Sequence, residues 1–357
     1  MKIIGVDLHT RQQTIAMLDD QTGELVEKQL AHEDEEVREF YAGLPKPVLV
    51  GLEATGSMQW FLQLLEELSI EFRVGHPAKI RAAEPRKQKN DRRDARLLLT
   101  LLAEKRFPAI WMPSREQRDL QILLRHRDQF VRIRTRVQLS LQALALSHGL
   151  RRGHTLWTRV GQHTLRALPL TGHAGEQRDT LLALYPQLQA PINELDREVE
   201  REAQQRAQAR RLMTHPGVGP ITALATEVFL GDPQRFADGK AVASYIGIIP
   251  KELSSGGRQR FGRISKQGNS LLRFLWGEAA IHAVRRDPEL RRFYRRKLAQ
   301  KGMGKARIAA ARKLGIRLWV MLRDEIDYTE FCRRGHQRRQ SSGGAACAGM
   351  LHVGQWS

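Results

Sequence analysis

The first 75 residues alternate short apolar strands with two helices, in an order that few folds can accommodate. Two aliphatic strands come first, and a turn that ends at Gly23 leads into a third. The segment 47–52 is apolar throughout, as expected of a buried strand. A helix from Glu33 precedes it, and a second helix over 59–68, with Ser57 as its expected N-cap, follows it. The expected strands are therefore 2–7, 13–18, 24–31, 47–52 and 71–75.

Three strands, a helix, a strand, a helix and a strand are the order of an RNase-H-like fold, which predicts a mixed α/β sheet. From Asp91 onward the pattern is helical. A long amphipathic run at 116–148 and a second, more polar run at 188–213 need a partner helix each, which predicts a coiled-coil hairpin. The expected organisation is an RNase-H-like α/β domain at 1–112, a helical coiled-coil segment at 113–212, a mostly α-helical C-terminal domain at 213–330 and a disordered tail at 331–357.

The chain carries 59 lysines and arginines against 39 aspartates and glutamates, a formal net charge of +20. Such an excess indicates a polyanionic partner, because each phosphate that a cation neutralises releases condensed counterions. A protein that binds membrane surfaces usually concentrates its charge on one amphipathic helix, whereas here arginine is spread over most of the chain. The charge therefore favours DNA or RNA as the partner, with a merely solvated basic surface as the plain alternative.

Hydropathy and cysteine usage exclude several other classes of protein. No apolar run approaches the ~20 residues that a bilayer-spanning helix needs, and the N-terminus lacks the pattern of a signal peptide. The only cysteines, Cys332 and Cys347, lie near the C-terminus. Their position excludes a disulfide scaffold and a cysteine-based zinc site, and we expect a cytoplasmic protein.

Four carboxylates occupy places where they can meet. Asp7 ends the first expected strand and Glu53 the fourth. In an RNase-H-like sheet these strands are parallel neighbours, so both side chains emerge at the same edge. Asp91 and Asp94 are three residues apart at a helix start and share one face. These oxygen ligands would suit one or two Mg²⁺ ions, or Mn²⁺, and would leave positions open for phosphate and water.

Ordinary strand-end and helix-cap roles are the alternative for these carboxylates, with Asp91 as a helix cap. Two features of their surroundings favour a metal site. Glu53 lies on an apolar strand, and a buried carboxylate usually needs a cation. Arg92 and Arg93 flank the two aspartates, as expected where phosphate meets a metal.

Glycines recur in the segment 214–223, which resembles the hairpin of a helix-hairpin-helix motif. In such a hairpin the backbone amides around Gly217 and Gly219 would face a DNA phosphate at a helix N-terminus. No strand precedes the segment and a third glycine is missing, so it is not a dinucleotide-binding loop. An ordinary turn between two helices is the alternative.

A serine-rich loop over 253–266 is followed by cations. Ser254 and Ser255 precede two glycines, which permit close backbone approach to a phosphodiester. The cations that could stabilise charge on a phosphorane-like transition state are Arg258, Arg260, Arg263 and Lys266. From the residues alone, a phosphate-binding loop without covalent chemistry is the alternative, and no histidine lies beside the serines to support a hydrolase-type triad.

Five motifs in this order resemble the DEDD transposases of insertion-sequence family 110, which are related to the pilin-gene inverting recombinases. The resemblance extends from Asp7 to about Arg323, nearly the whole chain. The motifs are Gly5-Val6-Asp7, Glu53-Ala54-Thr55-Gly56, Lys89-Asn90-Asp91-Arg92-Arg93-Asp94-Ala95, His215-Pro216-Gly217-Val218-Gly219-Pro220, and the stretch from Tyr245 through Ser255-Gly256 to Asn269.

The resemblance implies a transposase that moves an insertion sequence through a circular intermediate. Asp7, Glu53, Asp91 and Asp94 match the family's metal-binding carboxylates. Ser255 matches its nucleophile, which implies a 5′-phosphoserine intermediate and no nucleotide cofactor; the adjacent Ser254 leaves the register open. The resemblance also implies a non-coding bridge RNA that selects donor and target DNA, active sites shared within a homotetramer, and association with the bacterial nucleoid.

Two other functions stay open at this point. A RuvC-like metal-dependent DNA nuclease or resolvase would use the carboxylates without a covalent intermediate, and the serine loop would only hold phosphate. A non-catalytic architectural DNA- or RNA-binding protein would explain the charge, the hairpin and the coiled coil. It would leave the four carboxylates unexplained.

Overall fold

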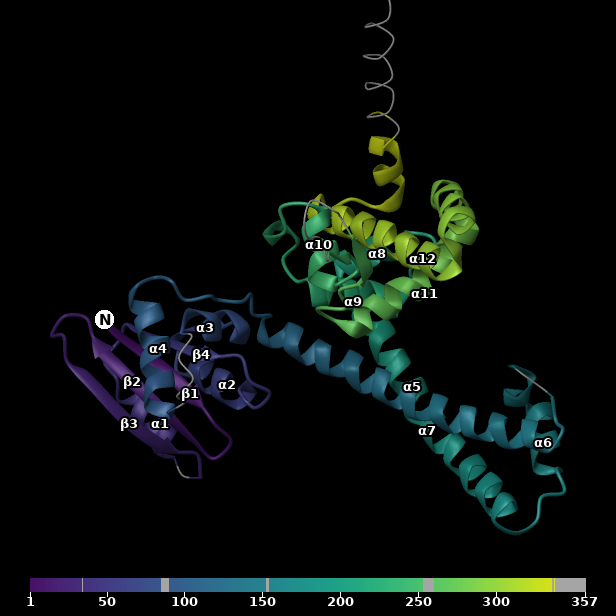
Figure 1. Ribbon diagram of the computed structural model, residues 1–357, viewed down its shortest axis with the longest axis horizontal. Helices are drawn as coiled ribbons and strands as arrows, with labels where there is room; N and C mark the ends of the chain where they lie inside the picture. Colours follow the sequence, from purple (N-terminus) through teal and green to yellow (C-terminus); the bar gives the residue numbers. More distant parts are fainter. Residues whose placement is uncertain (34, 85–89, 152–153, 253–259, 336, 338–357) are drawn as a thin grey trace, which may run out of the picture. The chain divides into compact units, whose positions relative to one another are not determined.

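A computed structural model describes the chain except at residues 34, 85–89, 152–153, 253–259, 336 and 338–357. The chain divides into two compact units, Met1–Arg115 and Glu116–Ser357 (Figure 1). The first unit contains a five-stranded sheet, and the described part of the second is helical apart from one short hairpin. Among the described residues, no helix is long and apolar enough to cross a membrane.

The N-terminal sheet has the mixed topology that the strand pattern predicts. β1 is antiparallel to β2, and β2 to β3, whereas β4 is parallel to both β1 and β5. Parallel neighbours need a crossover, and helix α1 (Glu36–Ala42) leads into β4 while α2 (Gln59–Glu67) joins β4 to β5. The strand order is β3 (Leu25–Ala31), β2 (Gln12–Asp19), β1 (Lys2–Leu8), β4 (Val48–Glu53) and β5 (Glu71–Gly75).

Helices cover both faces of this sheet, and the alternation of side chains along β1 decides which residues meet them. Ile4 packs with Phe61 of α2 in the larger apolar cluster. Ile3 points to the other face, where it packs with Leu99 of α4 (Asp91–Ala103). A short helix, α3 (Pro77–Ala83), follows β5 and was not expected from the sequence.

Glycines in β1 and β4 let α4 lie directly on the sheet. A Cβ on Gly5 would lie 2.2 Å from the carbonyl oxygen of Ala95 and 2.4 Å from the amide nitrogen of Leu99. A Cβ on Gly51 would lie 2.4 Å from Cδ1 of Leu102. The absence of side chains at these two positions therefore fixes how closely α4 approaches the central strands.

The expected hairpin of long helices is present in the second unit. α5 (Arg115–Ser147) and α7 (Gly172–Gln205) pair antiparallel: Arg127 donates to Asp196 at 2.7 Å and Arg134 to Gln189 at 3.0 Å. Leu141 and Leu182 lie in one buried cluster farther along the pair. The hairpin is confirmed, but its second helix begins at Gly172, well before the expected residue 188, and runs through Pro186.

The remaining helices of the second unit form one apolar core around Trp276, which is fully buried. Gly315 lies against this indole, and a Cβ there would be 2.1 Å from the ring. Smaller elements are α6 (Arg159–Arg166), η1 (His154–Trp157) and η2 (Pro233–Arg235). The core elements are α8 (Ala207–Met213), α9 (Pro220–Leu230), α10 (Gly239–Ile246), α11 (Ser270–Arg286) and α12 (Pro288–Arg323), with the strands β6 (Pro250–Glu252) and β7 (Phe261–Ile264).

Two expectations about local structure are corrected. Ser57 is not the N-cap of α2: Met58 occupies that position, and no side chain accepts a cap hydrogen bond there. The disordered tail was expected from 331, but residues 331–335 are helical, because Phe331 packs against the C-terminal core. Residues 336 and 338–357 lie outside the described residues.

Candidate metal centre

Asp7 and Glu53 lie at matching ends of two parallel strands. Val6 of β1 is in register with Leu52 of β4, so the next residue along each strand reaches the same edge of the sheet. Because side chains alternate, Asp7 lies on the same face as Gly5, which is the face that α4 covers. The same reasoning places Glu53, two residues after Gly51, on that face.

α4 contributes two further carboxylates from its first turn. Asn90, and not Asp91, caps the helix: its side chain accepts a hydrogen bond from the amide of Arg92 at 3.2 Å. Asp91 and Asp94 are therefore not needed as caps. They lie in the first turn of α4, on the stripe of residues that also contains Ala95, which is buried on the sheet. The close contact between Ala95 and Gly5 brings this first turn to the edge where Asp7 lies.

The clustering of acidic groups shows in the electrostatics of Asp7, whose side chain is only 20% exposed. Burial raises the pKa of the Asp7 carboxyl above its ordinary value, the charge of His9 opposes the rise, and Asp94 and Asp91 add to it. Asp7 is thus the partly buried member of an acidic group whose other member beside His9, Asp91, is 51% exposed. Such a site gains stability from a bound cation.

His9 lies between two of these carboxylates and was not among the residues expected at the site. Its Nε2 is 3.1 Å from Oδ2 of Asp7 and 3.4 Å from Oδ2 of Asp91. One ligand atom from each of the three residues lies within 4.8 Å of the others, a spacing at which they could hold one metal ion. The available signal was the spacing of Asp7 and His9, since residues two apart in an extended segment share a face.

The other predicted residues of the N-terminal unit lie around this group. Asp94 is close enough to Asp7 to affect its pKa. Glu53 shares the edge and the face, but the group of three ligand atoms does not include it. Arg92 and Arg93 are exposed in the first turn of α4. The structure therefore brings Asp7, Asp91 and Asp94 together and adds His9 to them.

The glycine hairpin lies in the second unit, between α8 and α9. Gly217 has φ +86°, and its backbone packs on α11, where a Cβ would lie 2.4 Å from the amide nitrogen of Ala283. Gly219 is the N-cap of α9. A cavity of about 380 Å³ opens beside them, lined by Gly217, Val218, Gly219, His282, Arg285 and Arg286. The hairpin thus brings a helix N-terminus close to two arginines, Arg285 and Arg286.

Of the serine loop, the structure describes only the flanks. Ser254, Ser255 and Arg258 lie outside the described residues. Arg260, Arg263 and Lys266 are exposed, on or beside β7, which pairs with β6 in the two-stranded sheet. These cations therefore face solvent, where a phosphate could reach them.

A mixed sheet with clustered carboxylates at the edge of its central strands, in a chain of net charge +20, defines a candidate metal-dependent enzyme that acts on polynucleotides. Comparison with known proteins supports this class of enzyme. The family of IS110-type DEDD transposases matches residues 4–148. The family described as "Transposase IS116/IS110/IS902 family" matches residues 209–295.

Individual relatives cover most of the chain. A "Probable family 20 transposase" of Pseudomonas aeruginosa is 30% identical over 82% of this chain and 89% of its own length. The transposase of insertion sequence element IS1111A from Coxiella burnetii is 26% identical over 78% of this chain and 79% of its own. The chain belongs to the IS110 family of DEDD transposases, and it is an enzyme that cleaves and rejoins DNA.

Proposed function

We propose that this transposase moves an insertion sequence by metal-assisted transesterification, with a RuvC-like N-terminal unit as its metal-binding part. The supporting observation is the convergence of Asp7 and Asp91 on His9, at one edge of the sheet. Asp7, Glu53, Asp91 and Asp94 would hold one or two divalent ions, Mg²⁺ or Mn²⁺, with the His9 imidazole as an additional ligand. The ions would supply Lewis-acid stabilisation of charge on the scissile phosphate.

Ser255 is the proposed nucleophile. Its Oγ would attack the phosphorus of the scissile phosphodiester, the bond from phosphorus to the 3′ oxygen would break, and the serine proton would pass to that oxygen. The products are a 5′-phosphoserine and a free 3′ hydroxyl, so the reverse step with another 3′ hydroxyl rejoins DNA without ATP. The exposed Arg260, Arg263 and Lys266 beside the loop support this role, because they could stabilise the developing charge.

The hairpin around Gly217 and Gly219 would hold the DNA backbone. Amides at the start of α9 and the guanidinium groups of Arg285 and Arg286 border the same cavity, and both are donors to phosphate oxygens. We extend the proposal to a bridge RNA that selects donor and target DNA and to a homotetramer with shared active sites. The net charge of +20 supports it, since several nucleic-acid strands must then be held at once.

A RuvC-like DNA nuclease or resolvase is the second candidate. It is favoured by the fact that the acidic group and His9 belong to the N-terminal unit alone, so that water could serve as the nucleophile with no contribution from the serine loop. The two candidates differ in one product, the covalent bond between protein and DNA.

The test is a cleavage assay with labelled element-end DNA and bridge RNA, read on a denaturing gel. We expect wild type to form a protein–DNA adduct, and Ser255→Ala to abolish the adduct and cleavage by at least about a thousandfold while DNA binding persists. Ser254→Ala is the matched control and should retain activity. Cleavage without an adduct in wild type would establish the nuclease, and loss of the adduct only in Ser254→Ala would move the nucleophile by one residue.

A further inference from the structure

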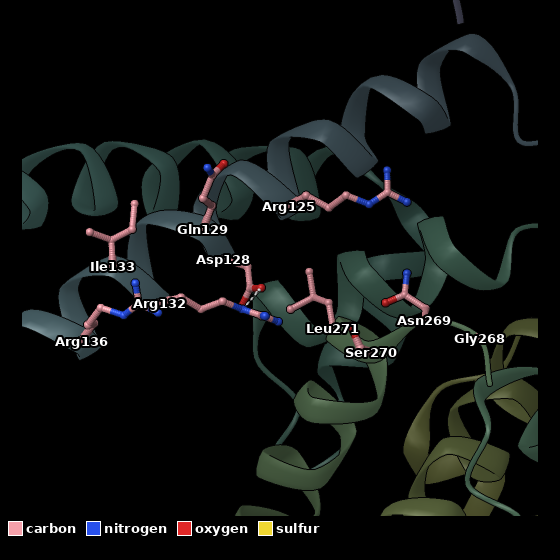
Figure 2. A pocket seen from close by; sticks show the side chains of 10 residues that line it. All are labelled: Arg125, Asp128, Gln129, Arg132, Ile133, Arg136, Gly268, Asn269, Ser270 and Leu271. Atoms are coloured by element: carbon pink, nitrogen blue, oxygen red, sulfur yellow. Dashed lines mark ion pairs between the residues drawn. The ribbon is translucent and has the colours of Figure 1, made fainter. Parts of the chain in front are cut away.

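A groove runs between α5 and the N-terminal end of α11, within the second unit (Figure 2). Its volume is about 670 Å³, and a hollow of about 710 Å³ continues from it along α5 to Phe274. None of the residues assigned above lines it. We name it the α5–α11 groove; its lining residues are Arg125, Asp128, Gln129, Arg132, Ile133, Arg136, Gly268, Asn269, Ser270 and Leu271.

One wall of the α5–α11 groove is a stripe of donors on α5. Arg125, Gln129, Arg132 and Arg136 follow one another at helical spacing over about 16 Å, and all four are exposed. Asp128, the one acidic residue of the lining, pairs with Arg132 at 2.7 Å. Within the described part of the chain, Arg125 and Arg136 have no carboxylate partner. Three arginines against one aspartate leave the groove with a charge of 3 − 1 = +2.

The opposite wall is held in place before any ligand arrives. The Asn269 side chain caps α11 by accepting from the amide of Leu272 at 2.9 Å. Arg273 donates to the carbonyl oxygens of Ile246 at 2.7 Å and Gln267 at 2.8 Å, which fixes the turn at 267–269. This wall is thus ordered before binding, which lowers the entropic cost of binding a ligand against it.

The floor and the continuation of the groove are apolar. Ile133 is 42% exposed, Leu139 60% and Phe274 53%, all beside the arginines of α5. A duplex hides the faces of its bases and offers mainly phosphate and sugar, and positively charged side chains are sufficient to bind these. An unpaired strand offers phosphates and apolar base faces together, and proteins bind it with cations combined with exposed aromatic side chains.

We propose that the α5–α11 groove binds an unpaired strand of DNA. Arg136, which has no carboxylate partner among the described residues, holds a phosphate of this strand, and Phe274 stacks on a base. A second copy of the chain is a poorer occupant, because it would have to bury the guanidinium of Arg136, for which the described ranges supply no carboxylate partner. The proposal rests on the DNA activity of the family and does not depend on the metal or serine assignments.

The test measures binding, by fluorescence anisotropy, of the full-length protein to a labelled oligothymidylate of about twelve nucleotides and to a duplex of equal length. We expect Phe274→Ala to weaken single-strand binding about tenfold and to leave duplex binding unchanged. Arg136→Ala should weaken single-strand binding and lower the slope of log affinity against log salt by about 0.7. Arg159→Ala, an exposed arginine on α6, is the control and should change neither.

Three outcomes would overturn the proposal. Equal loss of single-strand and duplex affinity in Phe274→Ala would mean that no base stacks there. If Phe274→Ala keeps its single-strand affinity and forms a smaller oligomer than wild type in light scattering, the apolar surface contacts a second copy of the chain. An oligouridylate bound more tightly than the oligothymidylate would move the proposal from DNA to RNA. Because Phe274 and Arg136 are exposed, both variants should fold, and thermal melting checks this.

Discussion

His9 lies between two carboxylates that are 84 residues apart in the chain, at positions 7 and 91. The imidazole contacts both through the same nitrogen, so it could act in either of two ways. As a metal ligand, His9 would add a nitrogen donor and favour transition ions over Mg²⁺, which prefers oxygen. As a cation itself, it would occupy the place of the metal and compete with it.

The two roles of His9 predict opposite results for one variant. We expect His9→Ala to weaken Mn²⁺ binding at least about tenfold and Mg²⁺ binding less, because the nitrogen ligand is lost. Isothermal titration of the full-length protein with each ion, without DNA, measures this directly. His173→Ala removes an exposed histidine of the second unit and is the matched control.

Tighter Mn²⁺ binding in His9→Ala would show that the imidazole competes with the metal. No binding of either ion to wild type would refute the metal centre itself. The titration therefore separates the failure of the ligand assignment from the failure of the site.

At the scale of elements, the metal centre depends on how closely α4 lies against β1. The contact is between backbones: the missing Cβ of Gly5 leaves room for the carbonyl of Ala95 and the amide of Leu99. Backbone atoms in a helix cannot move aside as a flexible side chain can. The register and distance of α4 therefore decide whether Asp91 and Asp94 reach Asp7.

Gly5→Ala should displace α4 from the sheet. We expect a loss of about 1–3 kcal/mol in the free energy of unfolding of the N-terminal unit, because the new methyl group overpacks a backbone contact. Metal affinity should fall with it, since the first turn of α4 moves. Urea unfolding and metal titration measure the two effects.

Gly304→Ala is the control, because a Cβ at Gly304 would meet nothing within 4 Å. It should leave stability within about 0.5 kcal/mol of wild type. Full stability and metal affinity in Gly5→Ala would contradict the packing that places α4.

At the scale of the whole molecule, segments that are far apart in the chain contact one another in the C-terminal core. His215, from the glycine hairpin, is 1% exposed, and its ring lies 4.5 Å from that of Tyr328. Tyr328 in turn donates to Asp287 at 2.8 Å, and Arg317 pairs with the same carboxylate. A charge on His215 would be buried beside a guanidinium, and the fold therefore requires the neutral imidazole.

This requirement predicts acid sensitivity. Burial lowers the pKa of His215 from 6.5 to about 4. Because the unfolded chain binds the proton more tightly, the contribution of His215 to stability is present above pH 6.5 and is lost as pH falls toward 4. Between pH 7 and pH 5 we expect wild type to lose about 2 kcal/mol more than His215→Phe, measured by urea unfolding at each pH.

His215→Phe keeps an aromatic ring and cannot titrate, and His215→Gln serves if the larger ring does not fit. The exposed His173 provides the control, since His173→Ala should keep the wild-type dependence on pH. Equal dependence in wild type and both His215 variants would contradict the neutral, buried state.

Much of the fold could be predicted from the sequence because its signals are local. Short apolar runs between turns predict the strands of the N-terminal sheet, and helical periodicity predicts α2 and α5. Patterns failed where local preference was overridden: α7 begins before Pro186 and continues through it, and residues 331–335 are helical where a tail was expected, with Phe331 packed on the core.

For the site, too, local features could be predicted from the sequence and contacts between distant segments could not. The sequence by itself determined that Asp7, Glu53, Asp91 and Asp94 are candidates, because strand ends and a helix start are local features. Only the tertiary structure decided that His9 lies among them and that Arg285 and Arg286 border the glycine hairpin. The physical reason is that each of these contacts depends on the distance between elements, and backbone packing at Gly5 and Gly217 sets that distance.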